Sequence, residues 1–330
     1  MMAAWITRRS FVAVAGAAVV GSRAAWGQGK LPVVAWLGTS TKETNGGYPA
    51  LLQGMADLGY VQGRDFLLIE RWNDGNVDLN VPLLKDLLQQ GPDVIVTNTV
   101  EALSGASQLT TVVPIVGGII PETAAAQLIG ESLARPKGNV TGVLGTSPGV
   151  LGKQIEVLHE ALPSEHRFGW LQTTLVEPSL SENRSAADAA GNALGLELVR
   201  TEARLPEEIA AGFAELVRRN VRGVVFEQSA LINSDRRRLV ALCAEAKLPA
   251  IFGNLAVVTQ AGGLMFYGFD TPTAFRRSSE HVVRILRGAK PSSLPVIVAS
   301  PLLAVNLKAA RDLGIAFPSS LLTRADQVVE

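Results

Sequence analysis

Short runs of apolar residues alternate along the chain with longer segments in which apolar residues recur every three or four positions. Residues 33–37 (VVAWL) form the first run, and a segment from Tyr48 to Gly59 follows, with Leu51 and Met55 on one face. A short apolar run predicts a buried strand, and the longer period predicts an amphipathic helix. Their alternation predicts parallel sheets with right-handed crossovers and helices on both faces.

The same alternation continues over most of the chain. Strands are expected at residues 33–37, 66–72, 94–97, 112–116, 140–144, 168–171, 196–201, 223–226, 250–252 and 264–267. Helices are expected at or near residues 48–59, 78–90, 122–134, 150–161, 181–194, 206–220, 234–246 and 273–287. These strands are too many for one small sheet, so we expect an α/β fold of two doubly wound parallel-sheet lobes.

The lobe boundaries are expected where strands end in polar or glycine-rich turns. The first lobe is assigned to residues 28–145, with roughly 268–292 returning to it. The second lobe is assigned to residues 146–267, with part of 293–330. The chain would therefore cross between the lobes several times, and we expect a hinge of several strands.

The first 27 residues have the layout of an export signal. Arg8 and Arg9 precede an apolar run at residues 11–20, and small residues lead up to Gly27. This order is typical of a twin-arginine signal peptide, since the apolar run is too short to cross a membrane. We expect cleavage between Gly27 and Gln28 and a soluble periplasmic product.

Composition and charge narrow the function classes. The chain is 47% hydrophobic and 18% charged, which is typical of a folded globular protein. It has 30 basic and 30 acidic side chains, so no basic excess points to nucleic acid. Cys243 is the one cysteine in the sequence, which excludes an intramolecular disulfide and a cysteine-based zinc site. We expect a monomer with no metal, no cofactor and no nucleic-acid partner.

One catalytic sequence motif occurs in the chain, but it lacks a group that the reaction requires. The glycine patterns of nucleotide-binding loops do not occur, and the three histidines form no His-x-x-x-His pair. Residues 145–149 (GTSPG) match the nucleophile elbow Gly-x-Ser-x-Gly, with Ser147 as the nucleophile. The next residue, Pro148, has no backbone N–H to donate to an oxyanion. We therefore expect no catalytic residue and interpret Ser147 as a helix cap.

Polar side chains follow many of the predicted strands. Because the carboxyl ends of parallel strands meet at one edge, these side chains define a candidate ligand site. The candidate ligand-binding residues are Thr39, Ser40, Asn98, Thr99, Glu122, Ser147, Thr173, Glu227, Gln228, Asn254 and Asp270. Carboxylates and helix N-termini together suit an amino-acid-like solute. The alternative is that the hydroxyls and amides are helix caps and the acids occupy first turns.

Several longer motifs resemble the substrate-binding proteins of ABC importers, in the family that includes tryptophan-binding proteins. These motifs are residues 53–64 (QGMADLGYVQGR), 69–72 (IERW), 92–96 (PDVIV), 135–142 (RPKGNVTG), 261–265 (AGGLM), 284–291 (RILRGAKP) and 306–322. The resemblance covers nearly the whole chain after the signal. It implies a periplasmic-binding-protein type I fold, a solute receptor, and an inner-membrane ABC permease as partner. Residues 117–122 (GGIIPE) and 172–178 (QTTLVEP) depart from the family pattern, so the ligands of relatives cannot be carried over.

Taken together, these observations predict a periplasmic receptor that closes two lobes on its solute. The solute is expected to be small and polar or amino-acid-like, with aromatic solutes included. The alternative is a secreted α/β enzyme that uses Glu122, Glu227 or Asp270 as an acid or base. A sensor domain related to sugar repressors is a third interpretation, which the export signal argues against.

Overall fold

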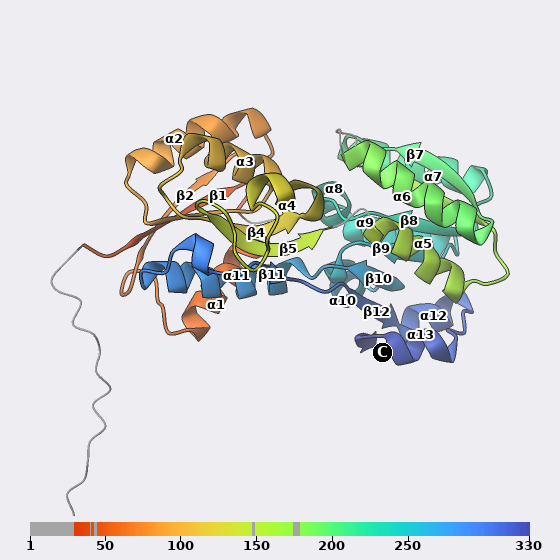
Figure 1. Ribbon diagram of the computed structural model, residues 1–330. Coiled ribbons are helices and arrows are strands. Elements are labelled where there is room, and N and C mark those ends of the chain that lie inside the picture. Colours follow the sequence, from red (N-terminus) through yellow and green to blue (C-terminus); the bar gives the residue numbers. More distant parts are fainter. Residues whose placement is uncertain (1–29, 40, 43–44, 147–148, 174–178) are drawn as a thin grey trace, which may run out of the picture. The chain divides into compact units, whose positions relative to one another are not determined.

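The computed structural model describes residues 30–39, 41–42, 45–146, 149–173 and 179–330 (Figure 1). The expected signal peptide, its cleavage site and two candidate ligand residues, Ser40 and Ser147, lie outside the described residues, as does Pro148. Among the residues described, no helix has the length and apolar character needed to span a membrane.

The first sheet is entirely parallel in its described pairs. Its strands, in spatial order, are β11 (Ile297–Val298), β5 (Val140–Thr146), β4 (Ile115–Pro121), β3 (Val94–Thr97), β1 (Val33–Gly38) and β2 (Leu67–Trp72). Helices α1 (Gly47–Asp57) and α11 (Thr271–Leu286) pack on one face, where Trp36 and Phe275 are buried. The other face carries α2 (Asn80–Gln89), α3 (Val100–Leu109) and α4 (Glu122–Leu128). Successive residues of β1 therefore enter two separate cores, as the period of a strand requires.

The second sheet is mostly parallel. Its spatial order is β13 (Gln327–Val329), β12 (Leu302–Asn306), β10 (Met265–Gly268), β9 (Ala250–Phe252), β8 (Gly223–Phe226), β6 (Arg167–Gln172) and β7 (Glu197–Glu202). The pair β10–β12 is antiparallel. One face packs against α5 (Gly149–Ala161), α6 (Ser179–Leu194), α12 (Leu307–Leu313) and α13 (Ser319–Arg324). The other face packs against α7 (Pro206–Arg218), α8 (Ala230–Ser234), α9 (Arg236–Glu245) and α10 (Leu255–Ala261).

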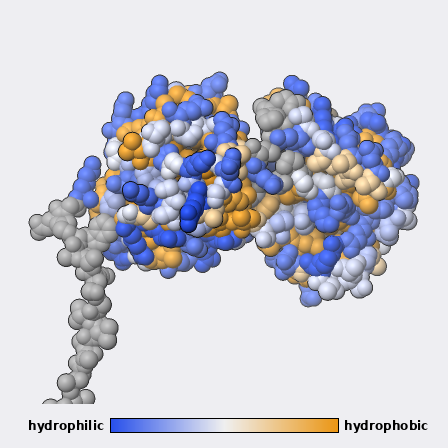
Figure 2. Space-filling view, viewed as in Figure 1, coloured by the Kyte–Doolittle hydropathy of each residue, from blue (hydrophilic) through white to orange (hydrophobic). Residues whose placement is uncertain are grey.

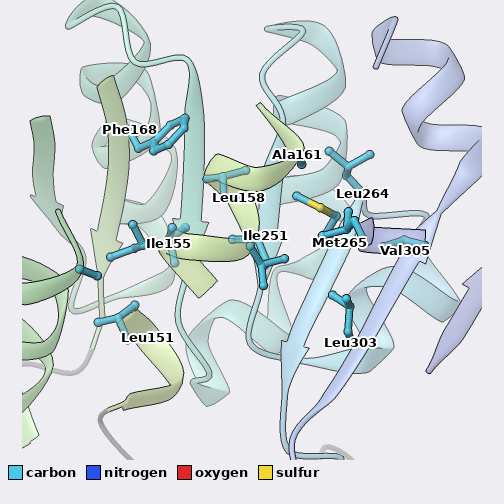
Figure 3. Close-up of a cluster of buried hydrophobic side chains, with 14 of the residues drawn as sticks. Leu151, Ile155, Leu158, Ala161, Phe168, Ile251, Leu264, Met265, Leu303 and Val305 are labelled. Atoms are coloured by element: carbon cyan, nitrogen blue, oxygen red, sulfur yellow. The ribbon is translucent and has the colours of Figure 1, made fainter. Parts of the chain in front are cut away.

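The core of the second sheet shows how an amphipathic helix is held. Leu151, Ile155 and Leu158 recur along one side of α5 and are all buried (Figure 3). They belong to the same cluster as Ile251 and Met265 of the central strands. In Figure 2, hydrophilic residues occupy much of the visible surface. This is expected because the helices bury their apolar faces against the sheets.

The chain passes between the two sheets more than once. It leaves the first sheet after β5, returns from β10 into α11, and enters the second sheet again between β11 and β12. Both sheets are therefore completed by segments from the last part of the chain. The predicted α/β fold of two parallel-sheet lobes is confirmed.

Several predicted elements differ from those observed. The strand expected at 112–116 is β4, which runs on through Gly117 and Gly118 to Pro121. A Cβ at Gly118 would lie 1.8 Å from the ring of Phe275, so glycine here admits an aromatic ring instead of ending the strand. The helix expected at 234–246 is α9, and a short additional helix that was not expected, α8, precedes it.

Candidate ligand-binding site

The carboxyl ends of the first sheet bring a row of side-chain positions together on one face. Gly38 of β1 pairs with Trp72 of β2, and Leu37 pairs with Thr97 of β3. Strands β2 and β3 flank β1 on its two sides. Asn98, directly after β3, and Trp72, at the end of β2, therefore lie on opposite sides of the end of β1. Because a Cβ at Gly38 would lie 2.1 Å from the Trp72 ring, the Trp72 ring occupies that space.

Two predicted ligand residues of this edge are in contact. The backbone N–H of Thr39 donates to Asn98 Oδ1 over 3.1 Å. This bond ties the loop after β1 to the loop after β3. Asn98 is half-buried, and its Nδ2 donates to no atom of the described residues. Asn98 can therefore present an amide N–H to a ligand acceptor at this edge.

Two other candidates cap helices, as the alternative interpretation expects, and a third stands at an N-cap position without a side-chain capping bond. Thr99 Oγ1 accepts from the N–H of Ala102 over 3.4 Å at the start of α3. Asn254 Oδ1 accepts from the N–H of Ala256 over 2.9 Å at the start of α10. Asp270 stands before α11, and its carboxylate accepts from the Thr273 hydroxyl. The bonds of Thr99 and Asn254 fix the backbone at a helix start, whereas that of Asp270 joins two side chains.

The acids at the two edges differ sharply in environment. Glu122 is exposed in the first turn of α4. Glu227, directly after β8, is only 4% exposed. Its Oε1 accepts from the backbone N–H of Thr173 at 2.6 Å and from the Thr173 hydroxyl at 3.0 Å. Its Oε2 accepts from Asn183 Nδ2 at 3.3 Å. These donors compensate the burial of the charge, so Glu227 joins β6, α6 and β8.

Gln228 connects the second sheet to a helix of the first. Its Nε2 donates to Thr271 Oγ1 over 2.8 Å, and Thr271 begins α11. The backbone of Gly253 passes close by, since a Cβ there would lie 2.3 Å from the Gln228 nitrogen. Gln228 and Asp270 thus adjoin the connection by which the chain returns to the first sheet.

A polar and aromatic cluster at the first sheet was not among the predicted site residues. Lys42 Nζ lies 2.5 Å from Glu70 Oε1 and 5.2 Å from the centroid of the Tyr48 ring. The Tyr48 ring lies 5.3 Å from that of Trp72 and 5.4 Å from that of Trp36, both close to edge-on. The available signal was the motif at residues 69–72, in which Glu70 and Trp72 share a face of β2.

The charge state of this cluster follows from its contacts. Burial alone would raise the pKa of Glu70, but hydrogen bonding from Lys42 and then Tyr48, with the Lys42 charge, outweighs it and the pKa is lowered. Burial, aided by the Glu70 carboxylate, raises the pKa of the Tyr48 hydroxyl. Glu70 is therefore ionised and Tyr48 neutral at pH 7. No group of three or more His, Cys, Asp or Glu side chains that could hold a metal ion occurs in the described part of the chain.

Comparison with known proteins identifies the family. The model of the family described as ABC transporter substrate binding protein matches residues 38–329, which span both sheets. The chain belongs to this family. The resemblance inferred from the sequence motifs is thereby confirmed. No match was found among curated protein sequences.

Solved structures of this type share the fold. A conserved domain protein from Vibrio cholerae is 23% identical with a TM-score of 0.77, covering 91% of this chain and 100% of its own. An ABC domain in complex with L-Trp from Streptococcus pneumonia is 25% identical with a TM-score of 0.74, covering 90% of this chain and 100% of its own. A ligand-free, open substrate binding protein with adhesive properties from Clostridium difficile is 18% identical with a TM-score of 0.66, covering 91% of this chain and 99% of its own.

Proposed function

We propose that the protein is a periplasmic receptor that binds a small polar or amino-acid-like solute and delivers it to an ABC permease. The observation that carries this proposal is the match of the substrate-binding family over residues 38–329. The match includes every strand of both sheets except residues 33–37 of β1, and all the passages of the chain between the sheets. The signal-like first 27 residues support a location outside the cytoplasm.

The mechanism we propose is closure of two lobes on a solute held between the carboxyl edges of their sheets. The first lobe would contribute Thr39, Ser40, Asn98, Thr99 and Glu122. The second would contribute Ser147, Thr173, Glu227 and Gln228, with Asn254 and Asp270 near the returning connection. An ABC permease in the inner membrane would receive the solute, and the receptor would act as a monomer.

The contacts of these residues suggest different contributions. Asn98 Nδ2 donates to no atom of the described residues, so Asn98 is the best placed to bond a solute directly. Glu227 is surrounded by protein donors, so we assign it to holding Thr173 in place. Thr99 and Asn254 would meet a solute through oxygen lone pairs that their capping bonds do not use.

The first experiment is to incubate the purified protein with a metabolite mixture and to identify the retained compound by mass spectrometry. A compound recovered unchanged, which also raises the unfolding midpoint in a thermal-shift assay, supports the receptor. A compound recovered in converted form would favour the secreted enzyme instead. If nothing is retained from mixtures of amino acids, sugars and small cations, the receptor proposal fails.

The second experiment tests the site with matched variants. Asn98→Ala should lower the affinity for the retained compound roughly tenfold, since a hydrogen bond to a buried ligand contributes about 1–2 kcal/mol. Asn192, exposed on α6, provides the control Asn192→Ala, which should bind as tightly as the parent. Equal binding by both variants would remove Asn98 from the site.

A further inference from the structure

The Glu70 cluster adjoins the candidate site, and of its residues Lys42 alone lies in a loop that follows a strand. In the register of β1 and β2, Trp36 pairs with Glu70, and Gly38 pairs with Trp72. Thr39 comes one residue after Gly38, and its N–H bonds Asn98. Glu70 and Trp72 therefore lie on the strand next to the one that leads into the Thr39–Asn98 contact.

The structure places an ammonium group in this cluster. Lys42 Nζ is bonded to Glu70 Oε1 and stands over the face of Tyr48. A carboxylate beside an aromatic face is the combination by which proteins hold an ammonium ion. Lys42 comes from the loop after β1, and its side chain remains 49% exposed against 29% for Glu70. The ammonium is therefore held at a position that solvent, and hence a solute, can reach.

The rest of the cluster is more deeply buried than Lys42. Glu70 Oε2 and Trp72 Nε1 are shielded from solvent, and Tyr48 and Trp72 are both hydrogen-bond partners of Glu70. Tyr48 is buried, and the N–H of Tyr48 is fixed by Asn45 Oδ1 at 2.9 Å. Glu70, Tyr48 and Trp72 thus form a preformed wall, whereas Lys42 is the replaceable member.

We propose that Glu70, Tyr48 and Trp72 form a subsite for the ammonium group of an amine-bearing solute, and that Lys42 fills this subsite when no solute is bound. The inference rests on the proposed function and names its substrate class. A solute amine would displace Lys42 from Glu70 and donate its own N–H groups to the carboxylate at Oε1, the oxygen that Lys42 vacates. Lys42 then competes with the solute amine for Glu70. The subsite adds no affinity for a solute that lacks an amine.

The sign of the effect at Lys42 separates this inference from its alternatives. Lys42→Met removes the competitor, and an exposed ion pair is worth about 0.4–1 kcal/mol, so amine binding should tighten about two- to fivefold. If Lys42 instead holds a solute carboxylate, the same variant weakens binding. If the ion pair only anchors the loop, binding does not change. Either of the last two results would overturn the inference.

The test uses the full mature chain and matched sets of probes. Each set is an L-amino acid, the amine that lacks its carboxylate and the acid that lacks its amine, for example L-tryptophan, tryptamine and indole-3-propionate. Thermal shift finds the sets that bind, and titration calorimetry gives their affinities. The inference expects binding by the amino acid to exceed that by the amine-free acid at least tenfold, and Glu70→Gln to abolish this difference.

Controls separate binding from folding. Lys290→Met and Glu245→Gln change exposed side chains elsewhere and should leave every affinity unchanged. The circular dichroism spectrum of Glu70→Gln should match that of the parent. If amine-free acids bind as tightly as amino acids, or if no amine-bearing probe binds, the inference is overturned. The proposed receptor function is judged apart from this, by whether any compound is retained from the metabolite mixture.

Discussion

Glu227 is a buried carboxylate that organises the edge of the second sheet. Two donors of Thr173 and one of Asn183 meet its oxygens, and Thr173 Oγ1 lies 2.8 Å from Ser229 Oγ. Ser229 in turn accepts from the N–H of Ile232 at the start of α8. The side chain thus connects loops that follow different strands. Removing this side chain should therefore affect the free energy of unfolding more than the affinity for a solute.

We expect Glu227→Ala to lower the free energy of unfolding by about 2 kcal/mol. The loss of the carboxylate leaves the backbone N–H of Thr173 and the side-chain amide of Asn183 without this acceptor in a part-buried place. Urea unfolding followed by circular dichroism measures the change. Glu245→Ala, at an exposed position of α9, is the control and should lie within about 0.5 kcal/mol of the parent. A stability equal to the parent for Glu227→Ala would contradict the structural role.

Gly38 offers a second test at the scale of one residue. Gly38→Ala would place a methyl group where the Trp72 ring lies, so the ring must move or the strand must shift. We expect a loss of about 1–3 kcal/mol of stability and weaker binding of amine-bearing solutes. Gly46→Ala is the matched control, because the nearest atom to its Cβ would be 3.8 Å away. Equal stability of the two variants would show that Trp72 yields easily.

At the scale of the element, helix α11 belongs to the first sheet although its sequence follows the second. His281 lies on its buried side, and its Nε2 donates to the carbonyl oxygen of Pro295 over 2.8 Å. Burial lowers the pKa of His281, and the bond to Pro295 offsets this only in part. The folded chain therefore favours the neutral ring more than the unfolded chain does.

This difference predicts a pH dependence of stability. Because the folded pKa lies below the unfolded value of about 6.5, the unfolded state binds the proton more readily as the pH falls through 6.5. Stability should therefore decrease between pH 7.5 and 5.5. The decrease should be smaller in His281→Gln, whose unfolding is measured by urea at each pH. His166→Gln, at an exposed position, is the control. Parallel pH profiles for the parent and His281→Gln would contradict this account.

Much of this fold could be predicted because, in most strands and helices, the spacing of the hydrophobic residues matches the period of the element. The exceptions have physical causes. Strand β4 runs through Gly117 and Gly118, and at Gly118 the space of a Cβ is taken by Phe275, a residue more than one hundred positions away. Strands β11 and β13 are too short to show a period. Strand β12 pairs antiparallel to β10, and no local sequence pattern predicts that direction. Tertiary contacts decided these elements.

The candidate site could be predicted only in outline. Position after a strand selected Thr39 and Asn98, which the structure brings into contact. The same rule cannot distinguish a cap from a ligand, and Thr99 and Asn254 prove to be caps. It also passed over Glu70, which lies inside a strand and meets Lys42 only through the fold. The remaining site residues stay predictions.

At the scale of the whole molecule, export is the property that the first 27 residues predict. Changing Arg8 and Arg9 together to lysine keeps the charge but removes the pair that the export machinery recognises. We expect the precursor to stay in the cytoplasm, as measured by fractionation and immunoblotting. Arg23→Lys, which leaves the pair intact, is the control. Undiminished periplasmic protein in the double variant would contradict the twin-arginine assignment.

The passage of the chain between the sheets has a consequence for how the protein is made. The first sheet lacks β11 and the cover of α11 until residue 298 has been synthesised, and the second lacks β12 and β13 until residue 329. While the last thirty or so residues are still inside the ribosome, the second sheet cannot be completed, and the last strand of the first sheet has only just emerged. Such distant pairings also slow folding, because large loops must close before they form. The nascent chain should therefore depend on chaperones until its release, and a truncation that removes β11 and all that follows should damage both halves together.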